Sequence, residues 1–564
     1  MKFNEYPYQR IDYDSFKKDF DQCTLKISEA KDAKTVLEGI NEASKLENHL
    51  ITMMTLCQIR FSINVNDKYY SAENDFWDDQ SPKYQEIINK YYLALTKSPY
   101  RSQLYATVPE VFFQRLDDQV LCFDSRIIPD LQQENKYVTQ YASLVAKAQI
   151  PYEGKNYTLS QLKALMTDMN RETRKTSSEA YYGYYAKHKA EFDQIYDNLV
   201  KIRTKIAKTL GFNNYVELAY KRMDRIDYDE KMVAQYRQDI VDYITPLAVS
   251  LRQKTQKRLG LETMYYYDAG VDFKDGNAKP LGDADTIIAN GVKMYHDLSP
   301  ETSKFIDFMM DHDLMNLLST PGKQAGGYST GIPDYEAPFI FANFRGTLED
   351  VGVLTHEAGH AFQGYESSWI TIPEITSPTM ESCEIHSMSM EFFTWKYMEL
   401  FFGNKADRYR YTHLMSTITF LPYGALVDHF QHVVYQHPEY TPAQRDKAWR
   451  DLEKVYIPDK NYEGNELLEN GGWWYQQLHI FHYPFYYIDY TLAQVCALEN
   501  FIRIQQNDPK AWSDYLALCK AGGTASFTHL VKNSGLQVPF EKSTMEHIAK
   551  FVSNYLDKID DSKL

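Results

Sequence analysis

Two histidines in the chain, His356 and His360, stand four residues apart, and Glu357 directly follows the first of them. Residues four apart share one face of a helix, so both imidazoles can reach a single zinc ion. Glu357 then projects to the side, where its carboxylate can take a proton from a water that the metal activates. The spacing therefore predicts a zinc-hydrolase centre, and the alternative is a pair of histidines that merely share a helix.

A catalytic zinc site needs a third protein ligand and an open coordination position. No third histidine follows at the spacing of an HExxHxxGxxH motif, so a glutamate on a later helix is the natural candidate. Ser377 and Pro378 predict the N-cap and the first residue of such a helix. The helix carries three glutamates near one face, and periodicity alone does not choose among them: Glu381, Glu384 and Glu391.

An aromatic segment near the C-terminus holds two histidines and four tyrosines: His479, His482, Tyr483, Tyr486, Tyr487 and Tyr490. Proline is tolerated at the first helical position, so we expect a helix to begin at Pro484. Phenols along one face of that helix can donate hydrogen bonds to an oxyanion. The alternative is an ordinary helix of an aromatic core.

The two motifs together resemble those of a known family. The stretch "VLTHEAGHAF" is followed, 24 residues after its second histidine, by the first glutamate of "EIHSMSMEFF". This arrangement resembles the thimet oligopeptidase and oligoendopeptidase F group, peptidase family M3. The glycine-rich "KQAGGYSTGIPDYEAPFIFANFRGT" and the late "LALCKAGGTASFTHLVKNSGL" are similar to further segments of that family. The resemblance covers roughly residues 200–545 and is closest to the short bacterial oligoendopeptidase-F-like members.

The resemblance implies a role for each polar residue of the first motif. In the family the ligand glutamate is followed seven residues later by another glutamate, as Glu384 is by Glu391. His356, His360 and Glu384 would therefore bind one zinc ion, and Glu391 would support the site from behind. Glu357 would act as the general base.

The family also has a histidine and several tyrosines at the place of the aromatic segment, assigned to substrate binding and to stabilising the tetrahedral intermediate. Its tyrosine spacing matches positions 483, 487 and 490. The implied catalytic residues are His479, Tyr483 and Tyr490, and the implied substrate-binding residues are Tyr486 and Tyr487. His482 is the alternative to His479.

A short strand is predicted upstream of the histidine helix, in "APFIFANF". We expect Pro338–Phe344 to be an edge strand, to which an extended peptide adds through backbone hydrogen bonds. Phe341 and Ala342 are then expected to contact the substrate. The histidine helix should begin at Thr347, with Asp350 in the capping-box position.

Helical periodicity dominates the rest of the chain. The stretch "ETMYYYDAGVDF", which starts at Glu262, is aromatic and is predicted to be a strand, so a small sheet is expected within about residues 262–345. We predict a mainly α fold with an N-terminal helical region at 1–200 and a catalytic region at 201–564. The resemblance adds two helical lobes around a deep substrate channel.

Composition limits the partners and the compartment. A formal net charge of −16 disfavours nucleic acid, whose phosphates demand basic patches. No apolar run approaches the ~18–20 residues of a membrane span, and the first residues lack the apolar core of a secretory signal. Six scattered cysteines indicate reduced thiols. We therefore expect a cytoplasmic protein that does not bind membranes.

The sequence thus predicts a zinc-dependent endopeptidase that hydrolyses internal bonds of short oligopeptides, with one zinc ion per chain. Three alternatives stay open: a dipeptide-releasing exopeptidase of the same family, a zinc-containing peptide-binding protein without turnover, and a zinc hydrolase of a non-peptide ester or amide. The intact Glu357 speaks against the binding protein, because a structural zinc ion does not need that residue.

Overall fold

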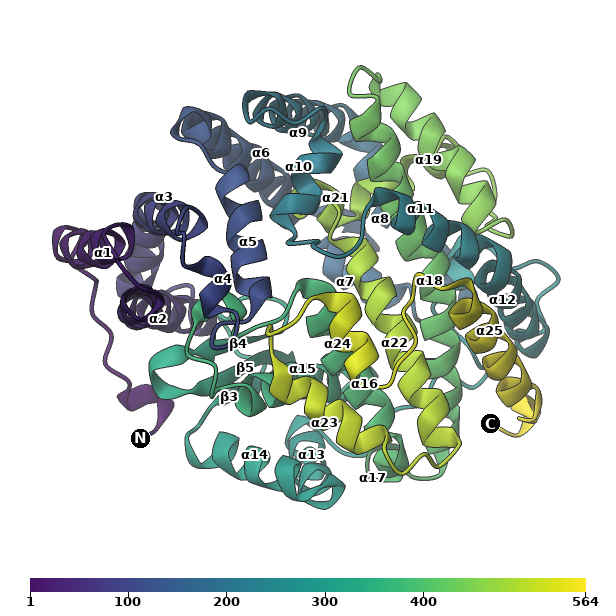
Figure 1. Ribbon diagram of the computed structural model, residues 1–564. Coiled ribbons are helices and arrows are strands. Elements are labelled where there is room, and N and C mark those ends of the chain that lie inside the picture. Colours follow the sequence, from purple (N-terminus) through teal and green to yellow (C-terminus); the bar gives the residue numbers. More distant parts are fainter.

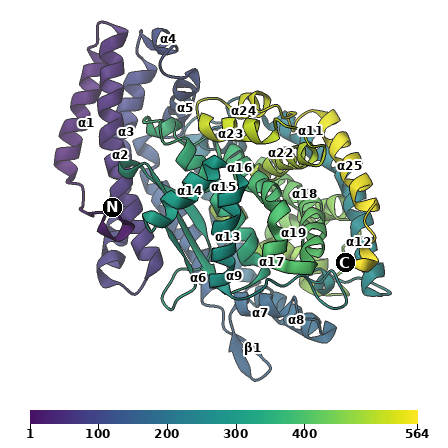
Figure 2. The ribbon, with the colours of Figure 1, turned by 90° about the horizontal axis from the view of Figure 1, so that it is seen from below.

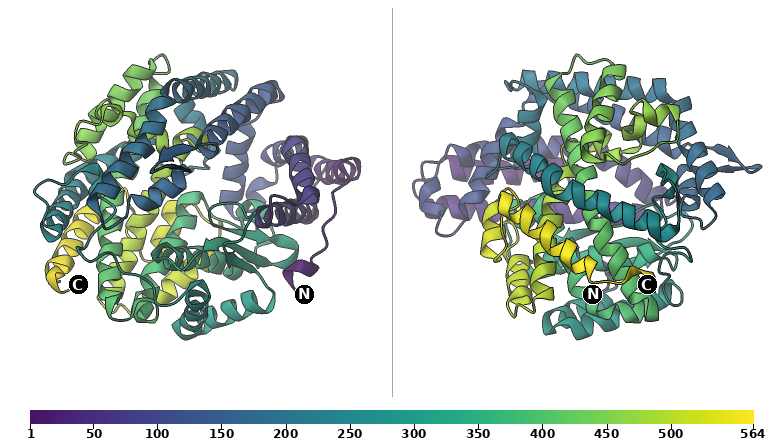
Figure 3. Two further views of the ribbon diagram at one scale, coloured as in Figure 1. Left: turned by 180° about the vertical axis from the view of Figure 1, so that it is seen from behind. Right: turned by 90° about the vertical axis from the view of Figure 1, so that its right-hand side faces the viewer.

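The computed structural model describes every residue from 1 to 564, and helices make up most of the chain (Figure 1). The predicted mainly α fold is confirmed. Five helices come first: α1 (Tyr13–Ser28), α2 (Ala33–Ile63), α3 (Lys68–Thr96), α4 (Arg101–Leu104) and α5 (Glu110–Leu121). The three long helices each begin where an aspartate side chain, from Asp12, Asp32 or Asp67, accepts a first-turn N–H. These helices stand together at one side of the molecule, far from the C-terminus (Figure 3).

A second group of helices follows: α6 (Ile128–Ala146), α7 (Leu159–Leu165), α8 (Arg171–Lys187), α9 (Lys189–Thr209), α10 (Tyr215–Arg222), α11 (Glu230–Asp239) and α12 (Thr245–Leu259). A hairpin of β1 (Ile150–Tyr152) and β2 (Lys155–Tyr157), which was not predicted, projects from the molecule beside α7 (Figure 2). Glu153 and Gly154 both have positive φ, at 48° and 76°. A two-residue turn with that backbone suits a hairpin, so the Glu–Gly pair was the available signal.

A three-stranded sheet consists of β3 (Met315–Leu318), β4 (Tyr328–Ile332) and β5 (Ala337–Phe344), in the order β3-β5-β4. β5 pairs in parallel with β3 and antiparallel with β4. The prediction of an edge strand at Pro338–Phe344 is therefore wrong, because this strand is central and β4 lies at the edge. The almost uninterrupted burial of β5 agrees with a central strand that is covered on both faces.

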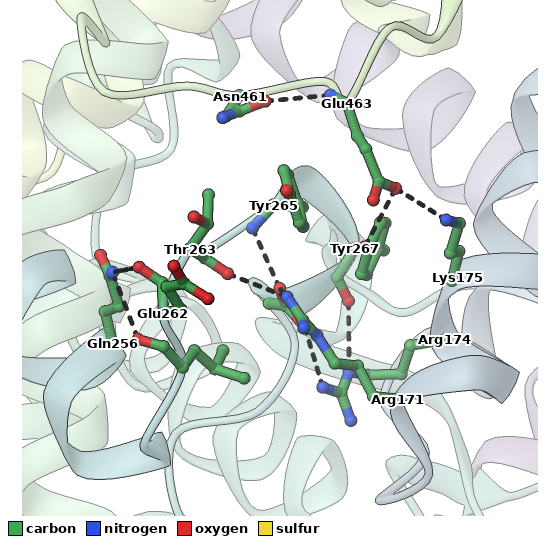
Figure 4. Close-up of polar contacts among 12 residues, drawn as sticks. Arg171, Arg174, Lys175, Gln256, Glu262, Thr263, Tyr265, Tyr267, Asn461 and Glu463 are labelled. Carbon is green, nitrogen blue, oxygen red and sulfur yellow. Dashed lines mark hydrogen bonds and ion pairs between the residues drawn. The ribbon is translucent and has the colours of Figure 1, made fainter.

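The strand predicted from Glu262 onward is also wrong. Tyr266–Asp268 form a single 3-10 turn, η4, whose three side chains are buried. The Asp268 carboxylate anchors the turn by accepting hydrogen bonds from Arg171 and Arg174 of α8 at 2.7–3.0 Å. Figure 4 shows the two arginines below Tyr265 and Tyr267. Tyr266 and Tyr267 are therefore buried in a turn that an ion pair holds, and they do not form a strand.

The remaining helices are α13 (Ala284–Leu298), α14 (Pro300–Asp311), α15 (Leu348–Glu366), α16 (Met380–Phe393), α17 (Met398–Phe402), α18 (Ala406–Gln436), α19 (Pro442–Tyr456), α20 (Glu466–Glu469), α21 (Leu478–His482), α22 (Tyr487–Gln505), α23 (Ala511–Ala521), α24 (Phe527–Asn533) and α25 (Lys542–Asp557). α15 packs on the three-stranded sheet, and α16 packs against both α15 and α22 near the centre of the molecule (Figure 1). None of the helices combines the length and the hydropathy that crossing a membrane requires.

Two hydrophobic cores hold these elements together. One core joins α1–α5 to the sheet and to α13–α15, and the other joins α6–α12 to α18, α22 and α25. α16 contributes to both, since Met390 belongs to the first core, and Ile385 and Phe392 belong to the second. The helices that carry the predicted ligands therefore meet where the two cores adjoin. The regional boundary expected at residue 200 stays a prediction.

Candidate metal centre and active site

The helix that carries the two histidines begins as predicted. Thr347 is its N-cap, and the Asp350 carboxylate accepts the three successive backbone N–H groups of residues 345–347 at 2.7–2.8 Å. These bonds fix the start of α15 and hence the direction of its exposed face. On that face the rings of His356 and His360 lie 5.0 Å apart, centroid to centroid.

Gly359 allows α16 to approach this helix closely. A Cβ at this position would lie 2.6 Å from the Cα of Ser387 and 2.7 Å from the carbonyl oxygen of His386. Both are backbone atoms, which cannot move aside as the end of a side chain can. Only glycine therefore permits this contact, which brings the side chains of α16 within reach of the imidazoles.

Glu384 of α16 points at both imidazoles. Its Oε2 lies 3.3 Å from Nε2 of His356 and 3.4 Å from Nε2 of His360. Ligand atoms about 2.0–2.2 Å from a tetrahedral zinc ion stand roughly 3.3–3.6 Å apart, so the three residues fit such an ion. The imidazoles remain 25% and 21% exposed, which leaves the site open to water and substrate.

Glu391, two turns after Glu384, lies behind His356. Its Oε1 is 2.7 Å from Nδ1 of His356. Burial alone would raise the pKa of the Glu391 carboxyl, but hydrogen bonds from His356 and His413 outweigh it and lower the pKa to about 2. The ionised carboxylate holds the proton of His356 on Nδ1 and leaves Nε2 available to a metal ion.

Glu357 lies beside the three candidate ligand residues rather than among them. Burial raises the pKa of its carboxyl, and the neighbouring imidazoles of His356 and His360 only partly offset this. Gly327, directly before β4, faces the carboxylate, since a Cβ there would lie 3.7 Å from Oε1 of Glu357. The glycine keeps the space in front of the carboxylate free of a side chain.

Glu381, one of the three candidate ligands, points elsewhere. It is buried, and neither of its carboxyl oxygens has a hydrogen-bond partner. Burial and the nearby Asp489 raise its pKa to about 8. Asp489 is itself paired with Arg225, at 2.8 Å. The structure thus brings Glu384 to the imidazoles, sets Glu391 behind one of them, and places Glu381 near a buried ion pair.

Two tyrosines of the aromatic segment come close to Glu384. The Tyr486 hydroxyl donates to Oε1 of Glu384 at 2.8 Å, and the ring of Tyr490 lies 4.8 Å from that of Tyr486. Burial and the charge of Glu384 raise the pKa of both phenols, so both stay protonated and can donate hydrogen bonds. Tyr483, in contrast, is 60% exposed.

Of the two candidate histidines, His479 lies among the tyrosines. Its ring centroid is 4.9 Å from that of Tyr487 and 5.8 Å from that of Tyr490. His482 instead packs against Tyr141, and its buried Nε2 has no partner. Burial lowers the pKa of His479 to about 4, so this imidazole is neutral near pH 7.

Gln477, which the sequence analysis missed, sets the tautomer of His479. Its Oε1 accepts a hydrogen bond from the Tyr423 hydroxyl at 2.7 Å, and its Nε2 lies 2.8 Å from Nδ1 of His479. With the amide oxygen engaged, the amide N–H faces Nδ1, so the imidazole proton is on Nε2. His479 can therefore donate a hydrogen bond through Nε2.

The tyrosines do not share one helix, which corrects the prediction of a helix from Pro484. α22 begins at Tyr487, and Phe485 adopts a left-handed backbone with φ of 69°. The Phe485 N–H donates to the Gln431 side chain at 2.9 Å, and its carbonyl accepts from Arg225 at 2.6 Å. Such a conformation costs roughly 1–3 kcal/mol, and these two partners hold it.

Phe341 and Ala342 do not have the free edge that strand addition requires. Both are fully buried on β5, whose two edges are taken by β3 and β4. β4 is one of the two edge strands of the sheet, and it begins directly after Gly327. The ring of Tyr328 in β4 stacks on that of Phe341, with 4.9 Å between the centroids. Phe341 therefore stabilises the edge strand through this cross-strand contact.

Comparison with known proteins identifies a family. Residues 164–550 match the model of peptidase family M3, and residues 3–123 match that of the peptidase M3 N-terminal domain. An oligoendopeptidase F homolog of Borreliella burgdorferi is 21% identical over 410 residues, which cover 69% of this chain and 66% of that protein. Oligopeptidase PepF of Bacillus subtilis is 21% identical over 411 residues, which cover 70% of this chain and 58% of that protein. The matched stretch thus spans about two thirds or less of these relatives' length.

Solved structures match the whole chain. PZ peptidase A with an inhibitor is 46% identical with a TM-score of 0.94, and the match covers 100% of both chains. A Bacillus anthracis protein described as a candidate oligoendopeptidase F is also 46% identical, with a TM-score of 0.90 over 100% of this chain and 99% of that one. The fold is therefore shared along the full length.

Proposed function

This chain belongs to peptidase family M3, a family of peptide hydrolases, and on that premise we propose that it is a zinc-dependent endopeptidase of short oligopeptides. The convergence of His356, His360 and Glu384, whose ligand atoms lie within 4.8 Å of one another, carries the proposal. These three residues would hold one zinc ion per chain, with a fourth position for water or substrate.

A zinc ion at this site would supply Lewis acidity, which polarises the scissile carbonyl and lowers the pKa of the attacking water. The residues of the chain would perform the proton transfers. Glu357 would take the proton from the water and pass it to the leaving amine. Its place beside the ligands supports this role, because a base must reach the water without competing for the metal.

We assign stabilisation of the tetrahedral intermediate to His479 and Tyr490, with the exposed phenol of Tyr483 as a further donor. The neutral imidazole with its proton on Nε2 and the protonated phenols support this assignment, since an oxyanion is stabilised by pre-oriented donors. The Tyr486 hydroxyl is engaged by Glu384, so Tyr486 would orient that carboxylate. Together with Tyr487 it would also contact the substrate.

The free edge of β4 is the proposed binding site for the substrate backbone, in place of β5. An extended peptide added to that edge would pass Gly327, next to Glu357. Backbone pairing depends little on side chains and so suits many peptide sequences. The names of the relatives, oligopeptidase and oligoendopeptidase, support short peptides as the substrates.

Replacing Glu357 with glutamine tests the assignment of the base. We expect Glu357→Gln to keep its zinc, because the ligands are unchanged, and to lose about 10²–10⁴-fold in kcat. Cleavage of quenched fluorescent peptides and metal analysis by atomic absorption measure both quantities. Glu349→Gln, at an exposed position of the same helix, is the matched control and should behave as the wild type. Near-full activity of Glu357→Gln would rule out the general-base role.

Peptides blocked at both ends test the endopeptidase assignment. Mass spectrometry of the products should show cleavage of internal bonds in such a peptide. A dipeptide-releasing enzyme that needs a free terminus would leave it intact but would shorten the unblocked form by two residues. A wild-type enzyme that binds zinc but cleaves neither form would be a binding protein, and the proposed function would then be abandoned.

A further inference from the structure

A chain of hydrogen bonds continues outward from the candidate metal site beyond Glu391. Glu391 Oε1 is 2.7 Å from Nδ1 of His356, and Oε2 is 2.6 Å from Nε2 of His413. Nδ1 of His413 in turn lies 3.0 Å from the indole nitrogen of Trp395. These residues come from α15, α16, the 3-10 helix η7 (Thr394–Tyr397) and α18, so the chain crosses four elements.

The chemistry of the indole fixes the direction of every bond in this chain. Trp395 Nε1 is a donor only, so Nδ1 of His413 must accept and must therefore lack a proton. The proton of His413 is then on Nε2, which donates to Glu391. Glu391 thus accepts from His413 on one oxygen and from His356 on the other.

Aromatic side chains hold the His413 ring in this orientation. Its centroid lies 5.1 Å from Phe392, 5.7 Å from Trp395 and 5.7 Å from Tyr409, and the Tyr409 ring is inclined to it by only 9°. The stacked and edge contacts oppose rotation of the imidazole. His413 and Trp395 are also mostly buried, with side-chain exposure of 12% for His413. The outer end of the chain is therefore rigid.

We propose that His413 and Trp395 are positioning residues that fix, through Glu391, the tautomer and ring orientation of His356. The inference rests on the proposed role of His356 as a zinc ligand. Without the hydrogen bond from His413, the Glu391 carboxylate is free to rotate away from Nδ1 of His356. The His356 ring could then turn, and the lone pair on its Nε2 would no longer point at the metal position. Partners that hold a metal ligand in this way change metal affinity by about 10–100-fold.

Zinc affinity, measured by competition with a chromophoric chelator, tests the proposal without recourse to activity. His413→Phe removes both hydrogen bonds and should weaken zinc binding by about 10–100-fold. His413→Gln keeps an amide N–H for Glu391 and a carbonyl oxygen for Trp395. It should restore affinity to within about threefold of the wild type, because the pattern of donors is retained.

Two tryptophans provide the matched pair of variants. Trp395→Phe removes an indole N–H that is bonded to His413, whereas Trp512→Phe removes one that makes no hydrogen bond to His413 or Glu391. Both positions pack among aromatic rings near Phe392 and Phe393. Trp395→Phe should weaken zinc binding by about tenfold, and Trp512→Phe should leave the zinc Kd unchanged.

The outcomes separate this inference from the proposed function. Equal zinc affinity of the wild type, His413→Phe and Trp395→Phe would overturn the positioning role, even if the wild type cleaves peptides. Equal losses in Trp395→Phe and Trp512→Phe would overturn it as well, because packing alone would then explain the effect. A wild-type protein that binds no zinc would instead refute the proposed function.

Discussion

At the scale of single residues, Gly359 governs the distance between the helices that carry the candidate ligands. We expect Gly359→Ala to destabilise the fold by about 1–3 kcal/mol, because its Cβ would meet the backbone of Ser387 and His386 at 2.6–2.7 Å. The forced separation of α15 from α16 should also weaken zinc binding, since Glu384 moves with α16. Urea unfolding and chelator competition measure the two effects.

Gly352→Ala is the control for this substitution. It lies in the same helix, and a Cβ there would meet nothing within 4 Å. Alanine should therefore raise stability by roughly 0.5–1 kcal/mol, as expected for a helix interior, and leave zinc binding as it is. If Gly359→Ala and Gly352→Ala had the same stability and the same affinity for zinc, the close approach of α15 and α16 would not be what positions Glu384.

Residue types and short spacings predicted the two histidines of the site and Glu357. The choice of Glu384 and Glu391 came from the family resemblance, and Gln477 and Trp395 were not predicted. The pair at positions 356 and 360 is local to one turn of helix, so its convergence follows from helix geometry. Gln477 and Trp395 act only through partners that tertiary packing brings to them, at positions 423 and 413. No spacing in the sequence marks such residues, because each bond depends on where another helix docks.

At the scale of elements, the η4 turn depends on the buried carboxylate of Asp268. Burial would raise the pKa of Asp268, but Arg171 and Arg174 lower it below its ordinary value. A depressed folded pKa means that the stabilisation is present above about pH 4 and is lost as the pH falls through the folded pKa. Asp268→Asn should cost about 3 kcal/mol near neutral pH, because two arginines lose their partner.

Urea unfolding at pH 7 and at pH 3 checks this prediction. The difference in the free energy of unfolding between the wild type and Asp268→Asn should be smaller at pH 3 than at pH 7. Asp285→Asn, an exposed position at the start of α13, serves as the control and should change little at either pH. If this difference in the free energy of unfolding did not change with pH, the arginine contacts would not depend on the charge of Asp268.

Local patterns predicted the start of α15 correctly but misplaced the starts of two other helices and the role of β5. α16 has Thr379 rather than Ser377 as its N-cap, and α22 begins at Tyr487 rather than at Pro484. Thr347 and Asp350 predicted the start of α15 because a cap is a contact within a few residues. The central position of β5 in its sheet depends on its parallel pairing with β3, a strand more than twenty residues upstream. No local sequence pattern encodes such a pairing. The absence of alternation in "APFIFANF" was the one available sign of a strand buried on both faces.

At the scale of the whole molecule, the candidate metal site joins helices from two hydrophobic cores. A ligand that binds only the folded state stabilises it, by about 4 kcal/mol when the free ligand is at 1,000 times its Kd. Removing zinc with a chelator should therefore lower the unfolding temperature, and zinc should restore it. Calorimetry with and without the chelator measures the shift.

Variants of the site supply the controls for this prediction. Glu357→Gln keeps the three proposed ligands, so the chelator should lower its unfolding temperature by as much as it lowers that of the wild type. His360→Ala lacks one ligand and should unfold at the same temperature with or without the chelator. An unchanged unfolding temperature in a wild-type protein stripped of its zinc would mean that the metal does not link the two cores.

The left-handed backbone at Phe485 also bears on the order of events during folding. Its two partners, Arg225 and Gln431, stand 260 and 54 residues earlier in the chain, so they must dock before the loop can take its shape. Closing contacts over such separations comes late, because the loop entropy is lost before the contact forms. The three candidate zinc ligands all lie between positions 356 and 384, so their convergence closes a much shorter loop than the contact with Arg225. A nascent chain would therefore bring its proposed metal ligands together before its proposed oxyanion donors, and we expect peptidase activity to appear only when folding is nearly complete.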